Sequence, residues 1–402
     1  MNILICYNGS LFPVYSDGQS LRIFNISKRL SRKHSIYLFC VKDQKSRWNP
    51  EEEYQAKELF EEVWFYEMRI KLYNIILDFI SVDHSIRCSY HSELKEIVKE
   101  IDRIVLEKDI DVLHVSGFPL NRILSYYSNV PKVLDLSDSR ALLKKREYEN
   151  SKQIRERVTV YMQYTRAKRI EDFIVNNYSM TTVVSDVDSR SILENIPTAR
   201  IAVITNGVDT NFFRPIQGVK EEYPSLIFFG NMNFPPNIDA ALYLHSEVLP
   251  LVKKAIPKVK LYIVGRNPVS EIQGINGKND TILTGEVEDV RPYIMRSSLV
   301  VIPMRIGSGI KNKVLETMAM GKPLVSTPRG VEALRPEVRA NIPIGIDAGE
   351  IAERIVSLLN NEGARKALAQ RVPRIVRKYH SWKLCADEYE KIYEKLIDRG
   401  KC

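Results

Sequence analysis

Short apolar segments alternate with helical patterns along the whole chain, and this alternation restricts the folds that the sequence can adopt. Such alternation is typical of parallel β-sheets that are covered by helices. It extends over residues 1–205 and, after a passage rich in turn residues, begins again at residue 225. Two series of similar length predict an α/β protein with two Rossmann-like domains.

The apolar segments place the strands of both expected sheets. In the first series we expect strands at Ile3–Cys6, Ser35–Val41, Val112–Val115, Lys132–Leu136, Met180–Val184 and Ile201–Ile204. In the second series we expect them at Leu226–Phe229, Val259–Val264, Thr281–Leu283, Leu299–Ile302 and Pro323–Ser326. The predicted organisation is an N-terminal domain over 1–205, a linker over 206–224, a C-terminal domain over 225–378 and a final helix over 379–402. Apolar residues lie on one face of that helix, at Cys385, Tyr389, Ile392 and Leu396.

The composition argues against several classes of protein. Of 402 residues, 44% are hydrophobic and 27% are charged, which is typical of a soluble globular chain. No apolar segment is long and clean enough to span a membrane, and the first residues lack a signal-peptide pattern. Five scattered cysteines and six isolated histidines show no metal-ligand spacing. We therefore expect neither a disulfide framework nor a metal site.

Positive charge is concentrated in one stretch of the chain. The formal net charge is +9, and between Arg140 and Arg169 ten basic residues stand against three acidic ones. Such a stretch suits an anionic membrane surface, a nucleic acid or a phosphorylated substrate. The segment Met68–Phe79, apolar with basic flanks, has the composition of an interfacial helix. We expect a peripheral contact with an anionic membrane surface, and a solvated basic helix is the alternative.

A glycine-rich turn between the expected strand at 299–302 and a helical pattern carries the clearest chemical signal. Its residues are Arg305, Gly307, Ser308, Gly309, Ile310, Lys311, Lys313 and Glu316. The glycines allow a tight turn and close approach of a ligand, and the start of a helix offers free N–H groups to an anion. The two lysines add positive charge, and Glu316 is an acceptor suited to ribose hydroxyls. The pattern predicts a site for a nucleoside diphosphate, with a surface helix bearing solvated lysines as the alternative.

The sequence around this turn resembles a known family. KNKVLETMAMGKPLVST is similar to the donor-binding signature of the family 4 retaining glycosyltransferases, which have the GT-B fold. Other segments resemble the family's further motifs in their usual order, among them ILICYNGSLFPVYSDGQSLRIF, VVSDVDSRSI, ITNGVDTNFFRP, LIFFGNMNFPPN, LYIVGRNP, ILTGEVEDVRPYI and STPRGVEAL. The resemblance covers nearly the whole chain. Within the family, the sequence resembles bacterial sugar transferases of exopolysaccharide and exosortase-associated clusters.

The resemblance implies a fold and an activity. The fold would be GT-B, with two Rossmann-like domains facing an interdomain cleft and a C-terminal helix that crosses back to the N-terminal domain. The activity would be retaining transfer of a hexose-type sugar from a nucleotide-diphosphate sugar to a hydroxyl of a glycan, lipid-linked or small-molecule acceptor, in polysaccharide or glycoconjugate biosynthesis. The enzyme would be independent of metals and would use the nucleotide sugar as co-substrate without a further cofactor. Separately from the resemblance, the scattered cysteines fit a reduced cytosolic chain, so we expect a cytoplasmic protein, peripheral at the inner face of the cell membrane.

The resemblance also assigns roles to individual residues. Donor binding would add Gly230, Asn231, Asn233 and Arg266 to the residues of the glycine-rich turn, and Lys311, Lys313, Glu316 and Asp138 form the expected catalytic set. Asp138 is added from the residues themselves, because it follows an expected strand and open α/β sheets bind ligands there; it would orient an acceptor hydroxyl, with capping of the next helix as the alternative. The loop that contacts acceptor or diphosphate would contain Ser16, Asp17 and Gly18, together with Ser116. For Ser16, Asp17 and Gly18 the alternative is a plain turn with a helix cap.

The chain departs from the family pattern at several of these positions. Ser308 stands where most members have a carboxylate that faces the transferred sugar, so sugar recognition differs or relies on backbone N–H groups. Asn231 and Pro236 replace an arginine and a lysine that bind diphosphate in many members. Ser116 is the nearest equivalent of an N-domain histidine, and we expect His114 to point into the fold.

Two other functions remain as alternatives. A nucleotide-sugar epimerase of the GT-B type would use the same donor site without an acceptor. A non-enzymatic nucleic-acid-binding protein would explain the basic charge but not the two Rossmann-like halves or the phosphate and ribose constellation.

Overall fold

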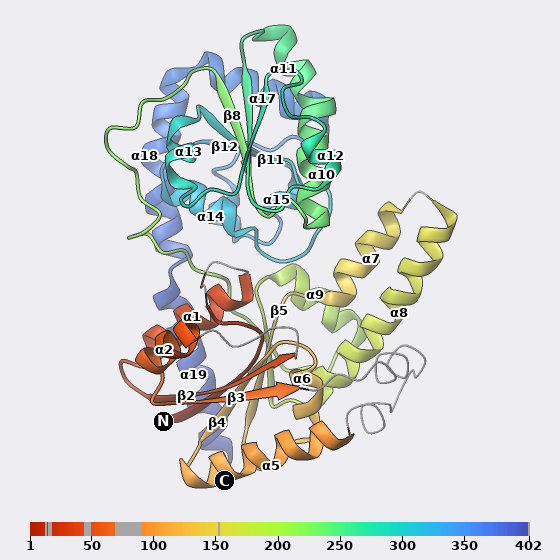
Figure 1. The fold of residues 1–402 in the computed structure, drawn as a ribbon, viewed down its shortest axis with the longest axis vertical. Helices are drawn as coiled ribbons and strands as arrows, with labels where there is room; N and C mark the ends of the chain where they lie inside the picture. Colours follow the sequence, from red (N-terminus) through yellow and green to blue (C-terminus); the bar gives the residue numbers. More distant parts are fainter. Residues whose placement is uncertain (13, 15–17, 44–49, 69–90, 152, 401–402) are drawn as a thin grey trace. The chain divides into compact units, whose positions relative to one another are not determined.

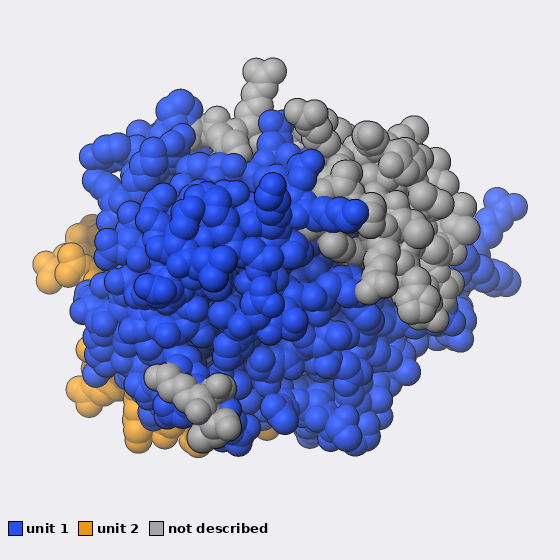
Figure 2. All heavy atoms as spheres, turned by 90° about the horizontal axis from the view of Figure 1, so that it is seen from below, with its two compact units in different colours: residues 1–205, 382–402 blue, residues 206–381 orange. Residues whose placement is uncertain are grey.

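The computed structural model describes the chain except residues 13, 15–17, 44–49, 69–90, 152 and 401–402. It divides into two compact units (Figure 1). Unit 1 combines Met1–Thr205 with Trp382–Cys402, and unit 2 is Asn206–Ser381. Figure 2 shows one face of unit 1 in blue.

Unit 1 contains a parallel sheet of seven strands in the order β3-β2-β1-β4-β5-β6-β7. The strands are β1 (Asn2–Asn8), β2 (Ser35–Asp43), β3 (Glu62–Met68), β4 (Val112–Ser116), β5 (Lys132–Ser137), β6 (Met180–Val183) and β7 (Ile201–Val203). The helices are α1 (Gly18–Leu30), α2 (Pro50–Leu59), α5 (His91–Glu107), α6 (Leu120–Ile123), α7 (Arg140–Asn150), α8 (Ile154–Asn176), α9 (Asp186–Asn195) and α19 (Trp382–Gly400).

Unit 2 contains a parallel sheet of five strands in the order β10-β9-β8-β11-β12. The strands are β8 (Ser225–Phe229), β9 (Lys260–Val264), β10 (Thr281–Gly285), β11 (Leu299–Ile302) and β12 (Leu324–Ser326). The helices are α10 (Pro235–Tyr243), α11 (Leu249–Ala255), α12 (Ser270–Gln273), α13 (Arg291–Arg296), α14 (Asn312–Ala319), α15 (Pro328–Val331), α16 (Pro336–Arg339), α17 (Ala348–Asn360) and α18 (Glu362–Tyr379).

The two expected Rossmann-like sheets are confirmed, and each expected strand corresponds to a strand of the structure. The strands of the core are continuous apolar segments because helices cover both faces of a parallel sheet. One strand, β3, was not predicted. It lies at the edge of its sheet, has a glutamate as its first residue, and buries only Met68 fully, so its sequence lacks the apolar continuity of the others.

The C-terminal helix crosses back onto unit 1, as expected. Helix α19 packs beside α1 (Figure 1), and its apolar face joins the core formed by β1, β2 and α1. The fully buried aromatic residues of this face are Trp382, Tyr389 and Tyr393. Ile392, which we expected on this face, is only partly buried. The apolar face of the helix is therefore rotated slightly toward Tyr393.

A buried polar network also holds α19 in unit 1. The Arg22 guanidinium donates to the Asp135 carboxylate over 2.8 Å and to the Tyr389 hydroxyl over 2.7 Å. Both members of the ion pair are fully buried. Burial opposes the ionisation of Asp135, but Arg22 and His114 hold its pKa well below the usual range. Since the charges are paired and hydrogen-bonded, the network fixes α19 in one position without leaving a buried charge uncompensated.

Candidate functional site

The order of the strands points to one edge of the sheet in unit 2. Strand β8 is central, with β9 and β10 on one side and β11 and β12 on the other. Open α/β sheets bind ligands beyond the carboxyl ends of the strands, at the point where the order reverses. That point lies between β8 and β11. The loops that follow these two strands contain most of the residues that the sequence assigned to donor binding.

The loop after β8 packs closely against the backbone that follows β9 and against the Lys313 side chain of α14. Gly230 has a φ of +153°, and a Cβ there would lie 2.9 Å from the Lys313 Nζ. Gly265, which follows β9, has a φ of +157°, and its Cβ would lie 1.7 Å from the Gly230 carbonyl oxygen. Only glycine fits at position 265, because any side chain would overlap with this backbone. The two glycines therefore allow the loop to pack against both β9 and α14.

Lys313 connects the first turn of α14 with the loop after β8. Its Nζ donates to the Asn237 Oδ1 over 2.8 Å and lies 4.4 Å from the centre of the Phe228 ring. Asn237 in turn donates to the Asn231 carbonyl oxygen over 2.9 Å. The pKa of Lys313 is lowered to about 7, mainly by burial; the charge of Glu316 opposes this shift, and the charge of Lys311 adds to it. A positive charge at this position is therefore poorly solvated and would be stabilised by an anion.

Glu316 lies one turn further along α14 and is half-buried. Burial raises its pKa to about 7, against the opposing charge of Lys313. Among the residues that the structure describes, none donates a hydrogen bond to its carboxylate. A half-buried carboxylate without a donor is able to accept hydrogen bonds from a ligand such as a diol.

Lys311 differs from Lys313, although the sequence suggested the same role for both. Its Nζ donates to the carbonyl oxygens of Ser308 and, over 3.1 Å, Gly309. Gly307 and Gly309 have φ values of +120° and +64°, which side chains rarely adopt. In this structure Lys311 closes the glycine-rich turn. Its direct role toward a phosphate stays a prediction.

The other expected donor residues lie around this turn. Arg305 binds Asp239 over 3.0 Å and lies 4.2 Å from the Tyr243 ring, so α10 compensates its charge. Asn231 and Asn233 form the turn after β8. Arg266 is half-buried at the end of β9, where its carbonyl oxygen accepts from the Met232 N–H over 2.9 Å. Ser308 is buried and Ile310 is half-buried in the turn.

In unit 1 the order of the strands reverses between β1 and β4. A Cβ at Gly117 would lie 2.8 Å from the Asn8 carbonyl oxygen, so the loops after these two strands touch. Ser116 is fully buried, accepts from Gln19 over 2.8 Å and donates to the Asp135 carbonyl oxygen over 3.3 Å. This expected residue therefore lies at the carboxyl edge of the sheet, already held by its neighbours.

The same edge carries buried oxygens that lack a partner. Within the described residues, neither Asn8 Oδ1 nor Ser137 Oγ makes a hydrogen bond. Ser137 ends β5 with a φ of +60°, and the half-buried Asp138 follows it. Ser139, not Asp138, caps α7 by accepting from the Leu142 N–H over 3.0 Å. Capping by Asp138 was therefore the wrong alternative, and its role toward an acceptor stays a prediction.

Three other predicted positions need to be placed. His114 is fully buried, with its Nδ1 2.6 Å from the Tyr393 hydroxyl, and so points into the fold as expected. Gly18 is exposed at the start of α1. Ser16 and Asp17 lie outside the described residues, as does the segment Met68–Phe79 apart from Met68, the last residue of β3.

Sequence reasoning missed two contacts of the α14 site. Asn237 holds Lys313, and Asn206 donates to the Asn312 Oδ1 over 3.0 Å at the start of α14. The Pro235-Pro236 pair gave a usable signal for Asn237, since proline is favoured in the first turn of a helix and therefore places Asn237 there. No comparable signal linked Asn206 with Asn312, which are far apart in the sequence.

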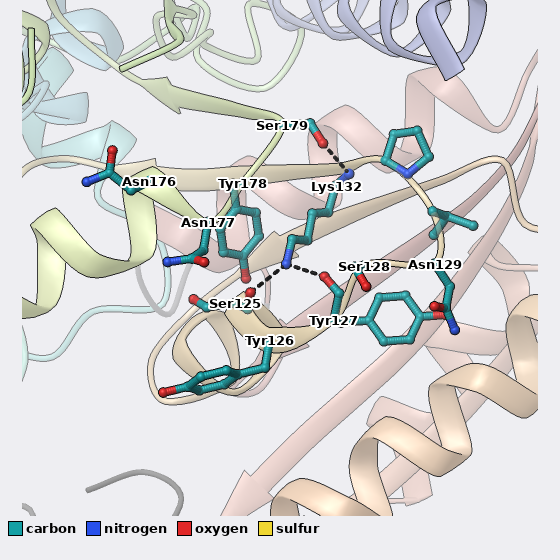
Figure 3. A pocket seen from close by; sticks show the side chains of 12 residues that line it. Ser125, Tyr126, Tyr127, Ser128, Asn129, Lys132, Asn176, Asn177, Tyr178 and Ser179 are labelled. Atoms are coloured by element: carbon teal, nitrogen blue, oxygen red, sulfur yellow. Dashed lines mark hydrogen bonds between the residues drawn. The ribbon is translucent and has the colours of Figure 1, made fainter. Parts of the chain in front are cut away.

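A separate hollow of about 760 Å³ lies at the opposite edge of the unit 1 sheet (Figure 3). Lys132, at the start of β5, is buried beside it, and burial lowers its pKa to about 8. Its Nζ donates to the carbonyl oxygens of Leu124 and Ser125, over 2.7 and 2.8 Å, and of Tyr127. All three donors of this ammonium group are in use, so Lys132 stabilises the turn after α6 and is not available to a ligand.

In the described part of the chain, no group of three or more histidine, cysteine or acidic side chains is placed to hold a metal ion. No helix there has the length and the apolar character needed to cross a membrane.

Comparison with solved structures identifies the fold class. Sucrose-phosphate synthase from Thermosynechococcus elongatus has a TM-score of 0.70 at 14% identity, with 99% of each chain covered. HepE from Anabaena, solved in complex with UDP and glucose, has a TM-score of 0.66 at 13% identity, with 98% of this chain and 99% of that chain covered. The two parallel sheets and these neighbours define a two-domain, Rossmann-like protein of the GT-B class.

Sequence comparison finds similar glycosyltransferases. Residues 223–361 match the model of the family "Glycosyl transferases group 1". The phosphatidyl-myo-inositol mannosyltransferase of Mycobacterium tuberculosis is 26% identical over 232 residues, which are 54% of this chain and 60% of that protein. The match thus spans less than two thirds of this relative's length. These matches support the resemblance to the GT4-like group of the group 1 glycosyltransferases that the motifs indicated.

Proposed function

We propose that the chain is a retaining glycosyltransferase that transfers a hexose-type sugar from a nucleotide-diphosphate sugar to an acceptor hydroxyl. The observation that carries the proposal is the pair of Lys313 and Glu316 on one face of α14, where the strand order of unit 2 reverses. A half-buried, poorly solvated cation and a carboxylate without a donor, one helical turn apart, match a phosphate and a ribose.

The donor would bind with its diphosphate at the start of α14 and at Lys313. The glycine-rich turn and Gly230 leave space for phosphate oxygens to approach the backbone. Glu316 would accept hydrogen bonds from both ribose hydroxyls. UDP is the first nucleotide to test, because UDP is named with the similar HepE structure.

The proposed chemistry needs no nucleophile from the protein. When the bond between sugar and diphosphate breaks, negative charge develops on the departing phosphate, and Lys313 and the N–H groups of α14 would stabilise it. The acceptor hydroxyl would approach on the face that the diphosphate leaves and give its proton to that phosphate. This course retains the anomeric configuration. These cations take the place that a divalent metal has in other transferases, so we propose a reaction without metal or further cofactor.

The acceptor would bind at the carboxyl edge of the sheet in unit 1. Asn8 Oδ1 and Ser137 Oγ are buried without hydrogen bonds among the described residues, and Asp138 lies beside them. Oxygens of this kind suit the hydroxyl groups of a sugar. A glycan, a lipid-linked sugar or a small molecule is compatible with them, and we place the reaction in cytoplasmic polysaccharide or glycoconjugate synthesis.

Binding of the donor tests this proposal before any acceptor is known. UDP and GDP should each be titrated into the wild-type protein and into Glu316→Gln, with the melting temperature as the readout. We expect one nucleotide to raise the melting temperature of the wild type and to have little effect on the variant. If neither nucleotide stabilises the wild type, or if Glu316→Gln responds equally, the assigned site is wrong.

A second assay separates a transferase from an epimerase. The protein is incubated with the matching nucleotide sugar, with and without a lipid extract, and the donor and the free nucleotide are measured. A transferase releases nucleoside diphosphate only when the acceptor is present. Conversion of the donor into an isomeric nucleotide sugar without the extract would contradict the proposal in favour of an epimerase.

A further inference from the structure

Helices α7 and α8 form a hairpin that extends away from the sheet of unit 1 (Figure 1). The hairpin begins at Arg140, directly after Ser137–Ser139 at the carboxyl edge of the sheet. The second half of α8 is anchored in the core through Ile174 and Val175. The first half has no such anchor, and its residues from 154 to 159 are all exposed.

The exposed half of α8 carries an apolar stripe, formed by Ile154, Val158, Tyr161 and Met162. These side chains are 83%, 57%, 49% and 55% exposed. Their spacing of four, three and one residues places them on one face of the helix. Eleven large hydrophobic residues are exposed in the described part of the chain, and four of them lie in this stretch of nine residues. Single exposed apolar residues are common, but a continuous stripe indicates a surface that binds a partner.

Basic residues flank the stripe on both sides. At about 100° per residue, Arg155 and Arg166 lie along one side of it, and Arg157 and Lys168 lie along the other. Arg155 and Arg157 are exposed. Between residues 154 and 169 the one acidic residue is Glu156, and its position is on the far side of the helix. Long basic side chains beside an apolar stripe are typical of a helix that lies in the interface of an anionic bilayer.

The structure shows that only some of the basic residues between Arg140 and Arg169 contribute to this surface. The sequence suggested the whole stretch from Arg140 to Arg169, but Arg146 is buried and Lys144 binds Glu147 over 2.6 Å. The accessible positive charge therefore lies mainly on α8, next to the apolar stripe.

We propose that the α8 stripe and its flanking basic residues form a docking surface for an anionic lipid bilayer. Charge complementarity selects this occupant. A second copy of the chain, packed stripe against stripe around a twofold axis, would bring the same basic rows face to face. A nucleic acid would satisfy the basic residues but would leave the apolar stripe without a partner. An anionic bilayer provides both phosphate groups and an apolar layer.

The position of the hairpin gives this surface a role. Because α7 follows Ser137–Ser139, docking would hold the proposed acceptor edge of unit 1 near the lipid headgroups. A lipid-linked sugar would then reach the enzyme without leaving the bilayer. This role rests on the proposed function, whereas the docking itself does not.

Co-sedimentation of the full-length protein with vesicles tests the proposal. Vesicles of phosphatidylcholine alone are compared with vesicles that also contain phosphatidylglycerol, at increasing salt. We expect binding only to the anionic vesicles, and we expect it to weaken with salt as the charges are screened.

Two double variants separate the apolar and the electrostatic contributions. Val158→Ser with Met162→Gln should lower the partition coefficient at least about tenfold, because the stripe loses its apolar side chains while the net charge stays the same. Arg155→Glu with Arg157→Glu should lower it about twenty-five-fold or more, at about fivefold for each charge lost. Matched controls are Leu106→Gln, which changes a residue 79% exposed on α5, and Arg371→Glu with Arg374→Glu on α18. The controls should bind like the wild type.

Several results would overturn the proposal. The proposal is wrong if the wild type does not bind anionic vesicles at low salt, or if the control variants lose as much binding as the α8 variants. A dimer in light scattering that Met162→Glu dissociates, without vesicle binding, would assign the stripe to a second copy. The nucleotide-induced rise in melting temperature should be equal in all variants, which shows that each is folded. If the protein binds anionic vesicles but no nucleotide changes its melting temperature, the docking proposal stands and the proposed function is rejected.

Discussion

Replacing Lys313 by methionine should weaken the binding of a nucleoside diphosphate by a little over a hundredfold. Methionine keeps the length and the apolar stem of the side chain but removes the charge that lies beside Gly230. A phosphate charge about 4 Å from the Nζ, at an effective dielectric constant of about 20, contributes about 4 kcal/mol. Since the pKa of Lys313 is about 7, protonating it at pH 7.5 costs about 1 kcal/mol. The net loss is about 3 kcal/mol.

Calorimetric titration with UDP or GDP and with the corresponding nucleoside measures this effect. Lys313→Met should lose affinity for the diphosphate and keep the wild-type affinity for the nucleoside, which has no phosphate. Lys366→Met, at an exposed residue of α18, is the matched control and should bind both ligands normally. The reasoning is refuted if Lys313→Met binds the diphosphate as tightly as the wild type, or loses both ligands to the same degree.

Three other predictions follow from the contacts described above. Glu316→Gln should raise the melting temperature at pH 8 more than at pH 5. The pKa of Glu316 is raised by folding to about 7, so the wild type loses stability as the pH increases from 4.5 to about 7, and the neutral glutamine avoids this loss. An equal effect at both pH values would contradict this. Gly265→Ala should destabilise the protein by several kcal/mol and abolish nucleotide binding, since its Cβ would overlap with the Gly230 carbonyl; unchanged urea unfolding would show that the loop moves freely. Removing residues 382–402 should make unit 1 insoluble or lower its melting temperature strongly, because Arg22 loses its hydrogen bond to Tyr389 and the core loses the apolar face of α19; a truncated chain with an unchanged melting curve would refute this.

The sequence predicts the sheets well because their strands are continuous apolar segments. Strand β3 escapes this reasoning because it lies at the edge of a sheet and has a partly polar sequence. The buried face of α19 was predicted to within one residue. Tyr393 is buried where Ile392 was expected, and this difference depends on the shape of the core against which the helix packs. Such differences are decided by packing between segments that are distant in the sequence. The hydrophobic periodicity of a single segment carries no information about that packing.

In the candidate site, too, local features could be predicted from the sequence and contacts between distant segments could not. The glycine-rich turn, Glu316 and the lysines could be located from local spacing, since all lie within one short segment. Their different environments could not, because Asn237 holds Lys313 from another helix while Lys311 folds back onto its own turn. The pKa values near 7 of Lys313 and Glu316 result from burial that the fold creates. The pairing of Arg22 with Asp135 joins residues far apart in the chain and left no local signal.

Transfer of a labelled sugar tests the central claim most directly. A nucleotide sugar carrying carbon-13 at the anomeric position is incubated with the protein and a lipid extract, and the anomeric signal is followed by NMR. We predict a new glycoside with the anomeric configuration of the donor, one nucleoside diphosphate released for each glycoside formed, and neither product with Lys313→Met. A glycoside of inverted configuration, or a sugar that stays on its nucleotide throughout, would contradict the proposed reaction.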